Sequence, residues 1–279
     1  MGTTCRCIAV AVFLVGALLL GSMVGAQQRG VLVRPDPIPD FLARKKTAHE
    51  TSIRALGSRG IVGYLPEVRR MVAAARLPPT GGDHAQRPQI ELTFREDIAV
   101  GLTTMGFTAT KIRRSQARGR DPIQAMARVT RGGASSEELL LLSDTVVIAR
   151  THLGKRSAML GDGLYSSTDF KVIAVWKGSP KVGESIVIRQ WSGRRPDGTT
   201  TSISGDLHAA PGTTYLLPLS RNLYEQRVAE HSRKARPVRS GYLLYGDAHE
   251  ILVRNGRQVA RVRGKPEDLD ALRAQAHAD

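Results

Sequence analysis

The chain has 279 residues, which is room for one ordinary domain with tails or for two small domains. Its formal net charge of +16 favours anionic partners, although scattered arginines are equally typical of a plain solvated surface. Cys5 and Cys7, the two cysteines, lie in a segment that we expect to be removed. The mature chain would then have no disulfides, no zinc–thiolate site and no cysteine nucleophile.

The N-terminus has the pattern of an export signal. Arg6 supplies a positive charge, residues 8–20 form an uncharged apolar run, and small residues follow at 24–26. This order predicts a signal peptide over residues 1–26, cleavage after Ala26 and a secreted or periplasmic protein. An uncleaved anchor is the alternative. No later segment is apolar enough to predict a stable membrane span in the mature chain.

Residues 27–134 look different from the rest of the chain. They carry 19 basic and 9 acidic side chains, and prolines and glycines interrupt them repeatedly. Helical patches are predicted at 66–77 and from Asp121 onward, and the alternation of residues 90–94 predicts a short strand. We interpret this region as a basic arm, partly helical or disordered, with a small helical domain as the alternative.

From Ser135 onward, short β-patterns follow one another. Ser135 and Glu138 have capping-box spacing and predict a short helix before a β-branched strand at 145–150. Residues 169–176 alternate, which places Trp176 in the core on the same face as Phe170. Further strands are predicted at the positions 185–191, 199–203, 214–219 and 242–245.

The C-terminal end predicts a hairpin and a helix. Asn255 and Gly256 separate strands at 250–253 and 258–262, and Pro266 opens an acidic-first helix that ends near Ala276. The pattern predicts a mainly β fold. It is a small Greek-key, OB-like barrel with a short N-terminal and a C-terminal helix, over residues 135–279, preceded by the weakly structured basic arm.

Four stretches of the barrel half carry a resemblance to a known group. They are residues 143–149, 170–178, 183–189 and 211–219. The segment 136–264 resembles uncharacterised secreted bacterial domains whose fold is like that of netrin modules and tissue inhibitors of metalloproteinases. The resemblance implies an OB-type barrel. The eukaryotic relatives depend on disulfides that this sequence lacks, so the resemblance does not imply inhibition.

The sequence offers no catalytic motif. The seven histidines have no metal-ligand spacing, and no nucleophile elbow or phosphate-binding glycine-rich loop with a lysine is present. Gly161, Asp162 and Gly163 resemble half of a calcium or phosphate loop but are more typical of a plain turn. We therefore expect no catalytic residue, no metal and no cofactor, and we favour a protein that is not an enzyme.

The most suggestive surface is a short basic and aromatic stretch. Arg189 and Trp191 project to one face of a predicted strand, and Arg194 and Arg195 follow. A tryptophan beside guanidinium groups suits stacking or anion binding. The alternative is that Trp191 caps the core while the arginines are solvated.

These patterns favour an exported, non-catalytic binding or interaction module of unknown ligand. The alternative is a binder of anionic polymers or surfaces, such as extracellular nucleic acid, lipid headgroups or wall polymer, through the arm and residues 189–195. A metal-dependent hydrolase built on loop histidines and acids is the third option. The partner, an anionic polymer or a protein, and the oligomeric state stay open.

Overall fold

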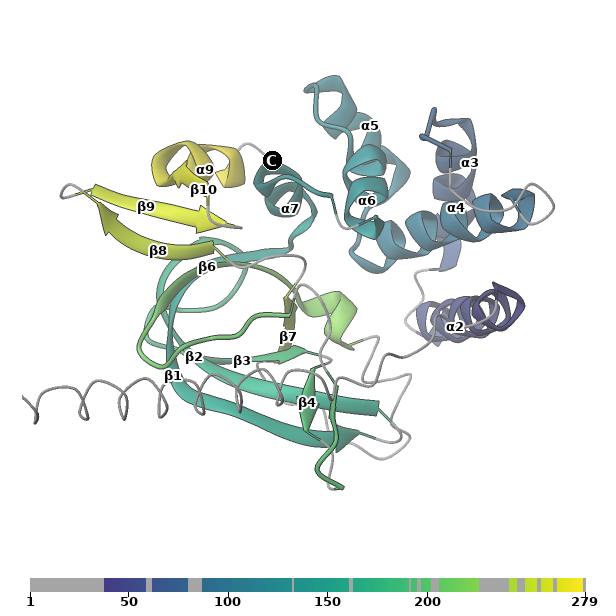
Figure 1. Ribbon diagram of the computed structural model, residues 1–279. Coiled ribbons are helices and arrows are strands. Elements are labelled where there is room, and N and C mark those ends of the chain that lie inside the picture. Colours follow the sequence, from purple (N-terminus) through teal and green to yellow (C-terminus); the bar gives the residue numbers. More distant parts are fainter. Residues whose placement is uncertain are drawn as a thin grey trace, which may run out of the picture. The chain divides into compact units, whose positions relative to one another are not determined.

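The computed structural model places a set of helices before a set of strands along the chain (Figure 1). It describes residues 38–58, 62–79, 87–131, 133–160, 163–190, 192–194, 197–201, 206–225, 241–244, 249–254, 257–262 and 265–277. The chain divides into two units after Phe41, and nearly all of these residues belong to the second unit, Leu42–Asp279. The predicted signal peptide and both cysteines lie outside the described residues.

The helices share one apolar core. Their bounds are α2 (Ile38–Ser58), η1 (Val62–Tyr64), α3 (Leu65–Ala74), α4 (Arg87–Thr104), α5 (Ala109–Ala117), α6 (Pro122–Thr130) and α7 (Ser136–Leu142). The most buried members of the core are spaced at helical intervals, as Val68 and Val72 are in α3. The weakly structured arm expected before Ser135 is therefore wrong for the described residues of this region, which are helical and packed.

The predicted strand at residues 90–94 is wrong, because these residues belong to helix α4. Residues 90–94 alternate locally, but the longer spacing of Phe94, Ile98 and Leu102 has a helical period, and all three are buried. Leu92 lies on the opposite side and is 68% exposed. The apolar face of the helix at residues 87–104 thus determines the conformation here. The two-residue alternation covers only five residues and is the weaker signal.

Two helices begin where the sequence predicts. The Asp121 side chain accepts a hydrogen bond of 2.9 Å from the backbone N–H of Ile123, and Pro122 occupies the first turn of α6. At α7, Ser135 and Glu138 form the predicted capping box, since each side chain bonds the backbone N–H of the other. Both helix starts are confirmed.

The strands form a closed barrel with additional strands. Their bounds are β1 (Thr145–Leu160), β2 (Gly163–Lys177), β3 (Ser185–Gln190), β4 (Gly193–Arg194), β5 (Thr200–Thr201), β6 (Thr214–Ser220), β7 (Gly241–Leu244), β8 (His249–Arg254), β9 (Arg257–Val262) and β10 (Lys265–Asp268). The large sheet has the order β1-β2-β3-β7-β6-β8-β9-β10, and the pairing of β1 with β6 closes a circuit of five strands. Strands β4 and β5 make a separate two-stranded ribbon.

The pairing directions agree with an OB-like barrel. All neighbours in the circuit are antiparallel except β3 and β7, which run parallel. A parallel pair needs a crossover, and here β6 provides it by lying between β3 and β7 in sequence. The barrel interior is apolar, and within it the rings of Phe170 and Tyr215 meet edge to face at 6.1 Å.

A second apolar layer lies on another face of the sheet. It joins side chains of β1, β2, β6 and β9 to Leu140 of α7 and to Leu272 and Ala276 of α9 (Leu269–His277). Trp176 is buried as predicted, but it belongs to this layer and not to the cluster of Phe170. Register shifts between β1 and β2, one of them between Ile148 and Ala149, account for the change of face.

The C-terminal elements differ slightly from prediction. Strands β8 and β9 pair antiparallel as the predicted hairpin, although its turn residues lie outside the described part. Residues 265–268 form β10, so α9 begins at Leu269 and not at Pro266. Among the described helices, none is long and apolar enough to cross a membrane.

Candidate functional site: a basic cavity

Of the predicted patch at residues 189–195, only Arg189 and Arg194 belong to the described part of the chain. Arg189 lies on β3, is half-buried, and has its guanidinium carbon 5.8 Å from the centre of the Tyr224 ring. Arg194 is exposed on β4, where its Nε donates to the carbonyl of Gly198 at 3.4 Å. Trp191 and Arg195 lie outside the described residues. A role for this stretch stays a prediction.

The described histidines do not form a cluster. His49 contacts Asp97, and His249 is fully buried beside Ser136, while His152, His208 and His277 are exposed. In the described part of the chain, no group of three or more histidine, cysteine, aspartate or glutamate residues is arranged to hold a metal ion.

A cavity of about 380 Å³ brings together basic side chains from distant parts of the sequence. It lies where the α4–α5 turn, α5, the end of α7 and the end of β2 meet. Among the described residues, its lining contains five cationic side chains and one carboxylate, that of Asp144. The cationic residues are Lys111, Arg114, Arg118, Arg120 and Lys177.

Helix α5 supplies most of this charge because of its spacing. Lys111, Arg114 and Arg118 follow at intervals of three and four residues and share one side of the helix. Ile112 lies on the other side and is fully buried in the helical core. The helix is therefore fixed by its apolar side while its basic side lines the cavity.

Two further cations complete the set: Arg120 follows α5 in the chain, and Lys177 comes from the end of a barrel strand. Lys177 closes β2, and Gly178 follows with a φ of +98°. A Cβ atom at Gly178 would lie 2.7 Å from Oγ1 of Thr145 and 3.1 Å from the carbonyl oxygen of Asp144. Only glycine permits this close approach, so Gly178 holds the end of β2, with Lys177, against the start of β1.

The single carboxylate already has partners. Both oxygens of Asp144 lie 3.2 Å from the backbone N–H of Arg221, and one lies 3.4 Å from that of Asn222. Asp144 thus caps the helical turn at residues 221–225, which we call the 221–225 turn. One carboxylate against five cations still leaves the described lining with an excess of positive charge.

The floor of the cavity is apolar. Met105, Leu141 and Leu142 are at most 5% exposed, and Phe107 is half-buried beside them. Of the five cations, Lys111, Arg114 and Arg118 are exposed, whereas Arg120 and Lys177 are half-buried. The arrangement suits a small anion, or the anionic group of a larger ligand, which enters with its charge toward α5 and β2.

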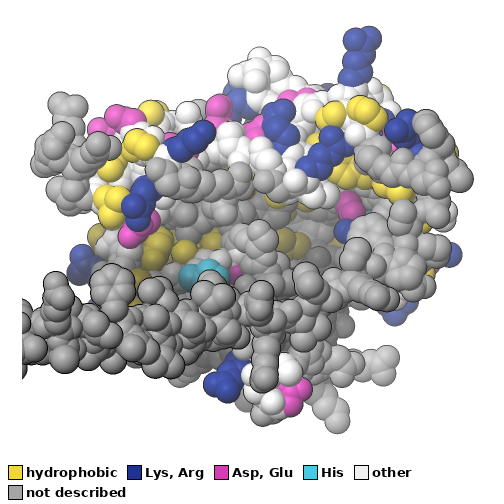
Figure 2. All heavy atoms as spheres, viewed as in Figure 1, with side chains coloured by type: hydrophobic (Ala, Val, Ile, Leu, Met, Phe, Trp, Pro, Cys, Tyr) yellow, Lys and Arg dark blue, Asp and Glu magenta, His cyan; other side chains and the backbone are white. Residues whose placement is uncertain are grey.

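Charges of both signs are mixed among the described residues on one face of the molecule. On the face seen in Figure 2, lysine and arginine side chains are spread among aspartate and glutamate and do not form one continuous patch. The high net charge of the chain therefore does not by itself mark a binding face there. The cavity is distinguished by five cations around one partly open space.

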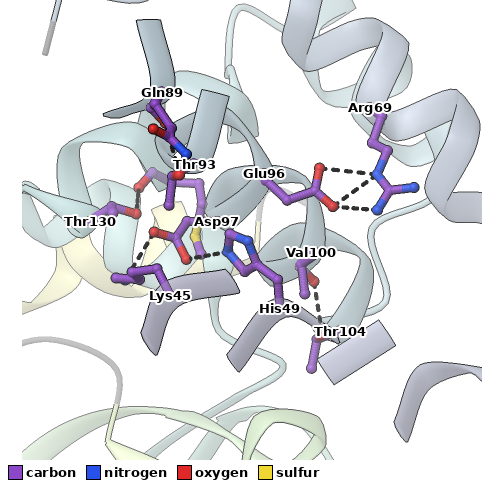
Figure 3. A network of polar contacts seen from close by, with 11 residues as sticks. Lys45, His49, Arg69, Gln89, Thr93, Glu96, Asp97, Val100, Thr104 and Thr130 are labelled. Carbon is purple, nitrogen blue, oxygen red and sulfur yellow. Dashed lines mark hydrogen bonds and ion pairs between the residues drawn. The ribbon is translucent and has the colours of Figure 1, made fainter. Parts of the chain in front are cut away.

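Two polar networks stabilise the fold around the cavity. In the first, Asp97 of α4 bonds Nζ of Lys45 at 2.9 Å and Nε2 of His49 at 2.7 Å, which joins α4 to α2 (Figure 3). Burial alone would raise the pKa of Asp97, but the His49 hydrogen bond and the Lys45 charge outweigh it and hold that pKa below 3.8. Arg69 and Glu96 form a second link, between α3 and α4.

The second network resembles a catalytic constellation only in its residue types. Oγ of Ser136 lies 2.7 Å from Nε2 of His249 and 2.7 Å from Oε1 of Glu267. The carboxylate therefore contacts the serine and lies on the Nε2 side of the ring, whereas a nucleophilic triad needs it on the other nitrogen. His249 is fully buried, so we interpret the cluster as a structural link between α7, β8 and β10.

Comparison with known proteins adds no relative to these observations. No protein-family model matches the chain, and no curated protein or solved structure matches it either.

Proposed function

We propose that this chain is an exported, non-catalytic binding module that takes an anionic ligand in the basic cavity. The observation that carries the proposal is the set of five cations around one partly open cavity, against one carboxylate in its described lining. Export is proposed from the signal pattern of residues 1–26. An exported chain would meet anionic ligands of the cell surface or of the medium.

The fold proposed for the module is an OB-type barrel of the kind found in netrin modules and tissue inhibitors of metalloproteinases. Support comes from the five-stranded circuit and its one parallel pair, β3 with β7. In OB folds, ligands bind at the loops that join the strands. The position of the cavity agrees in part with this placement, because Asp144 immediately precedes β1 and Lys177 ends β2.

The proposal predicts that anion binding depends on a cation of α5 and does not depend on an equally exposed cation elsewhere. We expect the full mature chain to bind inorganic pyrophosphate with an affinity that falls as salt rises. Arg114→Ser should weaken this binding about tenfold, since a charge-assisted hydrogen bond contributes roughly that much. Isothermal titration calorimetry at low and high salt measures both effects.

Arg273→Ser is the matched control. Arg273 is also exposed on a helix, α9, but it does not line the cavity, so the variant loses the same charge without changing the site. Thermal unfolding should show that both variants fold like the original chain. Equal affinity of the two variants for pyrophosphate, or no binding by the original chain, would contradict the proposal.

A further inference from the structure

A second, smaller cavity adjoins the basic one. Its volume is about 190 Å³, and Gly106 and Phe107 of the α4–α5 turn line both spaces. Gly106 has a φ of +80°, and a Cβ atom built on it would lie 3.7 Å from Nδ2 of Asn222 and 4.0 Å from Nζ of Lys111. One residue of each cavity therefore lies close to the same glycine, and the two cavities share the α4–α5 turn as a wall.

The chemistry of the second cavity contrasts with that of the first. It has no lysine or arginine in its described lining. The lining consists of the turn residues Gly106 and Phe107 together with Tyr64, Thr103, Thr104, Thr108, Asn222 and Glu225. These side chains offer hydroxyl, amide and carboxylate groups beside two aromatic rings, those of Tyr64 and Phe107.

Tyr64 gives the second cavity an accessible ring. Its side chain is 50% exposed, and it makes no capping hydrogen bond at the start of α3 although it occupies the N-cap position. A half-exposed tyrosine beside hydrogen-bonding groups suits a ligand with one apolar face and a polar edge, as sugar rings have. Tyr64 is therefore the residue of this cavity whose role a variant can test without disturbing the core.

Glu225 narrows the choice of ligand. Its carboxylate pairs with Arg221 at 3.2 Å on the exposed 221–225 turn. A carboxylate accepts hydrogen bonds from neutral hydroxyl groups, whereas it repels the phosphates of a nucleic acid backbone. The same turn is capped by Asp144, a residue of the basic cavity, so one contact fixes the position of both spaces.

We infer that the ligand is an acidic oligosaccharide: its anionic group occupies the basic cavity and a neighbouring neutral sugar occupies the second cavity, against Tyr64. The inference rests on the proposed function and narrows its ligand class. Carboxylate, sulfate and phosphate groups share the chemistry that the cations recognise. An extended nucleic acid is disfavoured because it needs a basic groove with several stacking rings.

The experiment compares ligands that fill one cavity or both. The probes are inorganic pyrophosphate, a neutral tetrasaccharide of N-acetylglucosamine, and a panel of tetrasaccharides that carry carboxylate, sulfate or phosphate groups. At least one acidic tetrasaccharide should bind the full mature chain about tenfold more tightly than pyrophosphate does, and more tightly than the neutral tetrasaccharide.

The variants separate the two cavities. Tyr64→Ala should weaken binding of the acidic tetrasaccharide about tenfold and leave pyrophosphate binding unchanged. Tyr64→Phe should bind like the original chain because it keeps the ring. Arg114→Ser should weaken the binding of both ligands. Leu92→Ala is the matched control, since Leu92 is 68% exposed on α4 and lines neither cavity.

The outcomes distinguish this inference from the proposed function. If pyrophosphate binding depends on Arg114 but every acidic tetrasaccharide binds no more tightly, the basic cavity stands and the saccharide inference is overturned. If no probe responds to Arg114→Ser, both fail. An oligonucleotide or anionic vesicle that binds more tightly than the saccharides, with the same dependence on Tyr64, would also overturn the inference.

Discussion

Asp97 shows how one side chain can link two helices. It bonds both Lys45 and His49, which are four residues apart on α2, and its side chain is 22% exposed. At neutral pH the carboxylate is ionised and holds α2 against α4. Since the folded-state pKa of Asp97 lies below 3.8, its contribution to stability is present above that pH and is lost as the pH falls through the lowered value.

We therefore predict that Asp97→Asn lowers the free energy of unfolding at neutral pH by about 1–3 kcal/mol. The difference from the original chain should shrink as the pH falls below 3.8, where the original carboxyl also becomes neutral. Urea titrations at neutral and acidic pH measure it. Asp270→Asn, at an exposed position of α9, should change stability by less than about 0.5 kcal/mol at either pH. A difference for Asp97→Asn that is independent of pH would contradict the argument.

At the scale of the element, α7 joins two apolar layers. Leu139, Leu141 and Leu142 belong to the helical core, whereas Leu140 faces the layer that contains Trp176 and α9. Ser136, at the start of the same helix, bonds His249 and Glu267. A helix of seven residues is thus held on several sides.

Leu140→Ala should consequently lower the free energy of unfolding by about 2–5 kcal/mol, because Leu140 is fully buried and truncation leaves a cavity. Chemical denaturation measures the loss, and hydrogen exchange should show faster opening of α9, which packs on the same layer. The exposed Leu92→Ala serves again as the control, with an expected change below about 0.5 kcal/mol. An equal effect of the two substitutions would show that α7 does not join the layers.

The sequence predicts elements better than it predicts how they combine. The capping box of Ser135 and the strand alternation that follows it are local signals, and the structure confirms them, whereas the alternation at residues 90–94 belongs to helix α4. The sequence predicts the wrong face for Trp176. Its face depends on the register shifts between β2 and its partner strand β1, which a single-strand pattern does not contain. The basic cavity was missed for a similar reason: the spacing of Lys111, Arg114 and Arg118 is visible in the sequence, but their meeting with Lys177 depends on packing between α5 and the barrel.

At the scale of the whole molecule, helices and barrel belong to one unit that begins at Leu42. The predicted boundary between residues 134 and 135 stays a prediction, although the helices before it share a buried core with α7. In the sequence, the apolar residues of these helices form short patches that look unrelated, because each helix contributes only a few of them. Their common core exists only after the helices assemble.

Limited proteolysis tests this organisation. Peptides from α3 to α6 should resist trypsin for as long as peptides from β1 to β3, because both sets are anchored in buried clusters. Mass spectrometry of a digestion time course measures the order of cleavage, and heat-unfolded protein provides the control in which every region is cut. Early loss of residues 62–130 with survival of the strands would restore the basic-arm interpretation for that region.

The outer end of the large sheet has a consequence for self-association. Closing β1 onto β6 leaves β10 as the terminal strand of the order, and it is only four residues long. Its exposed Pro266 has no N–H to donate to an added strand, and Lys265 and Asp268 place charges beside it. Such a strand is a poor template for fibril growth. Shortening the chain before Lys265 would instead leave β9, a six-residue strand without proline, at the end of the sheet.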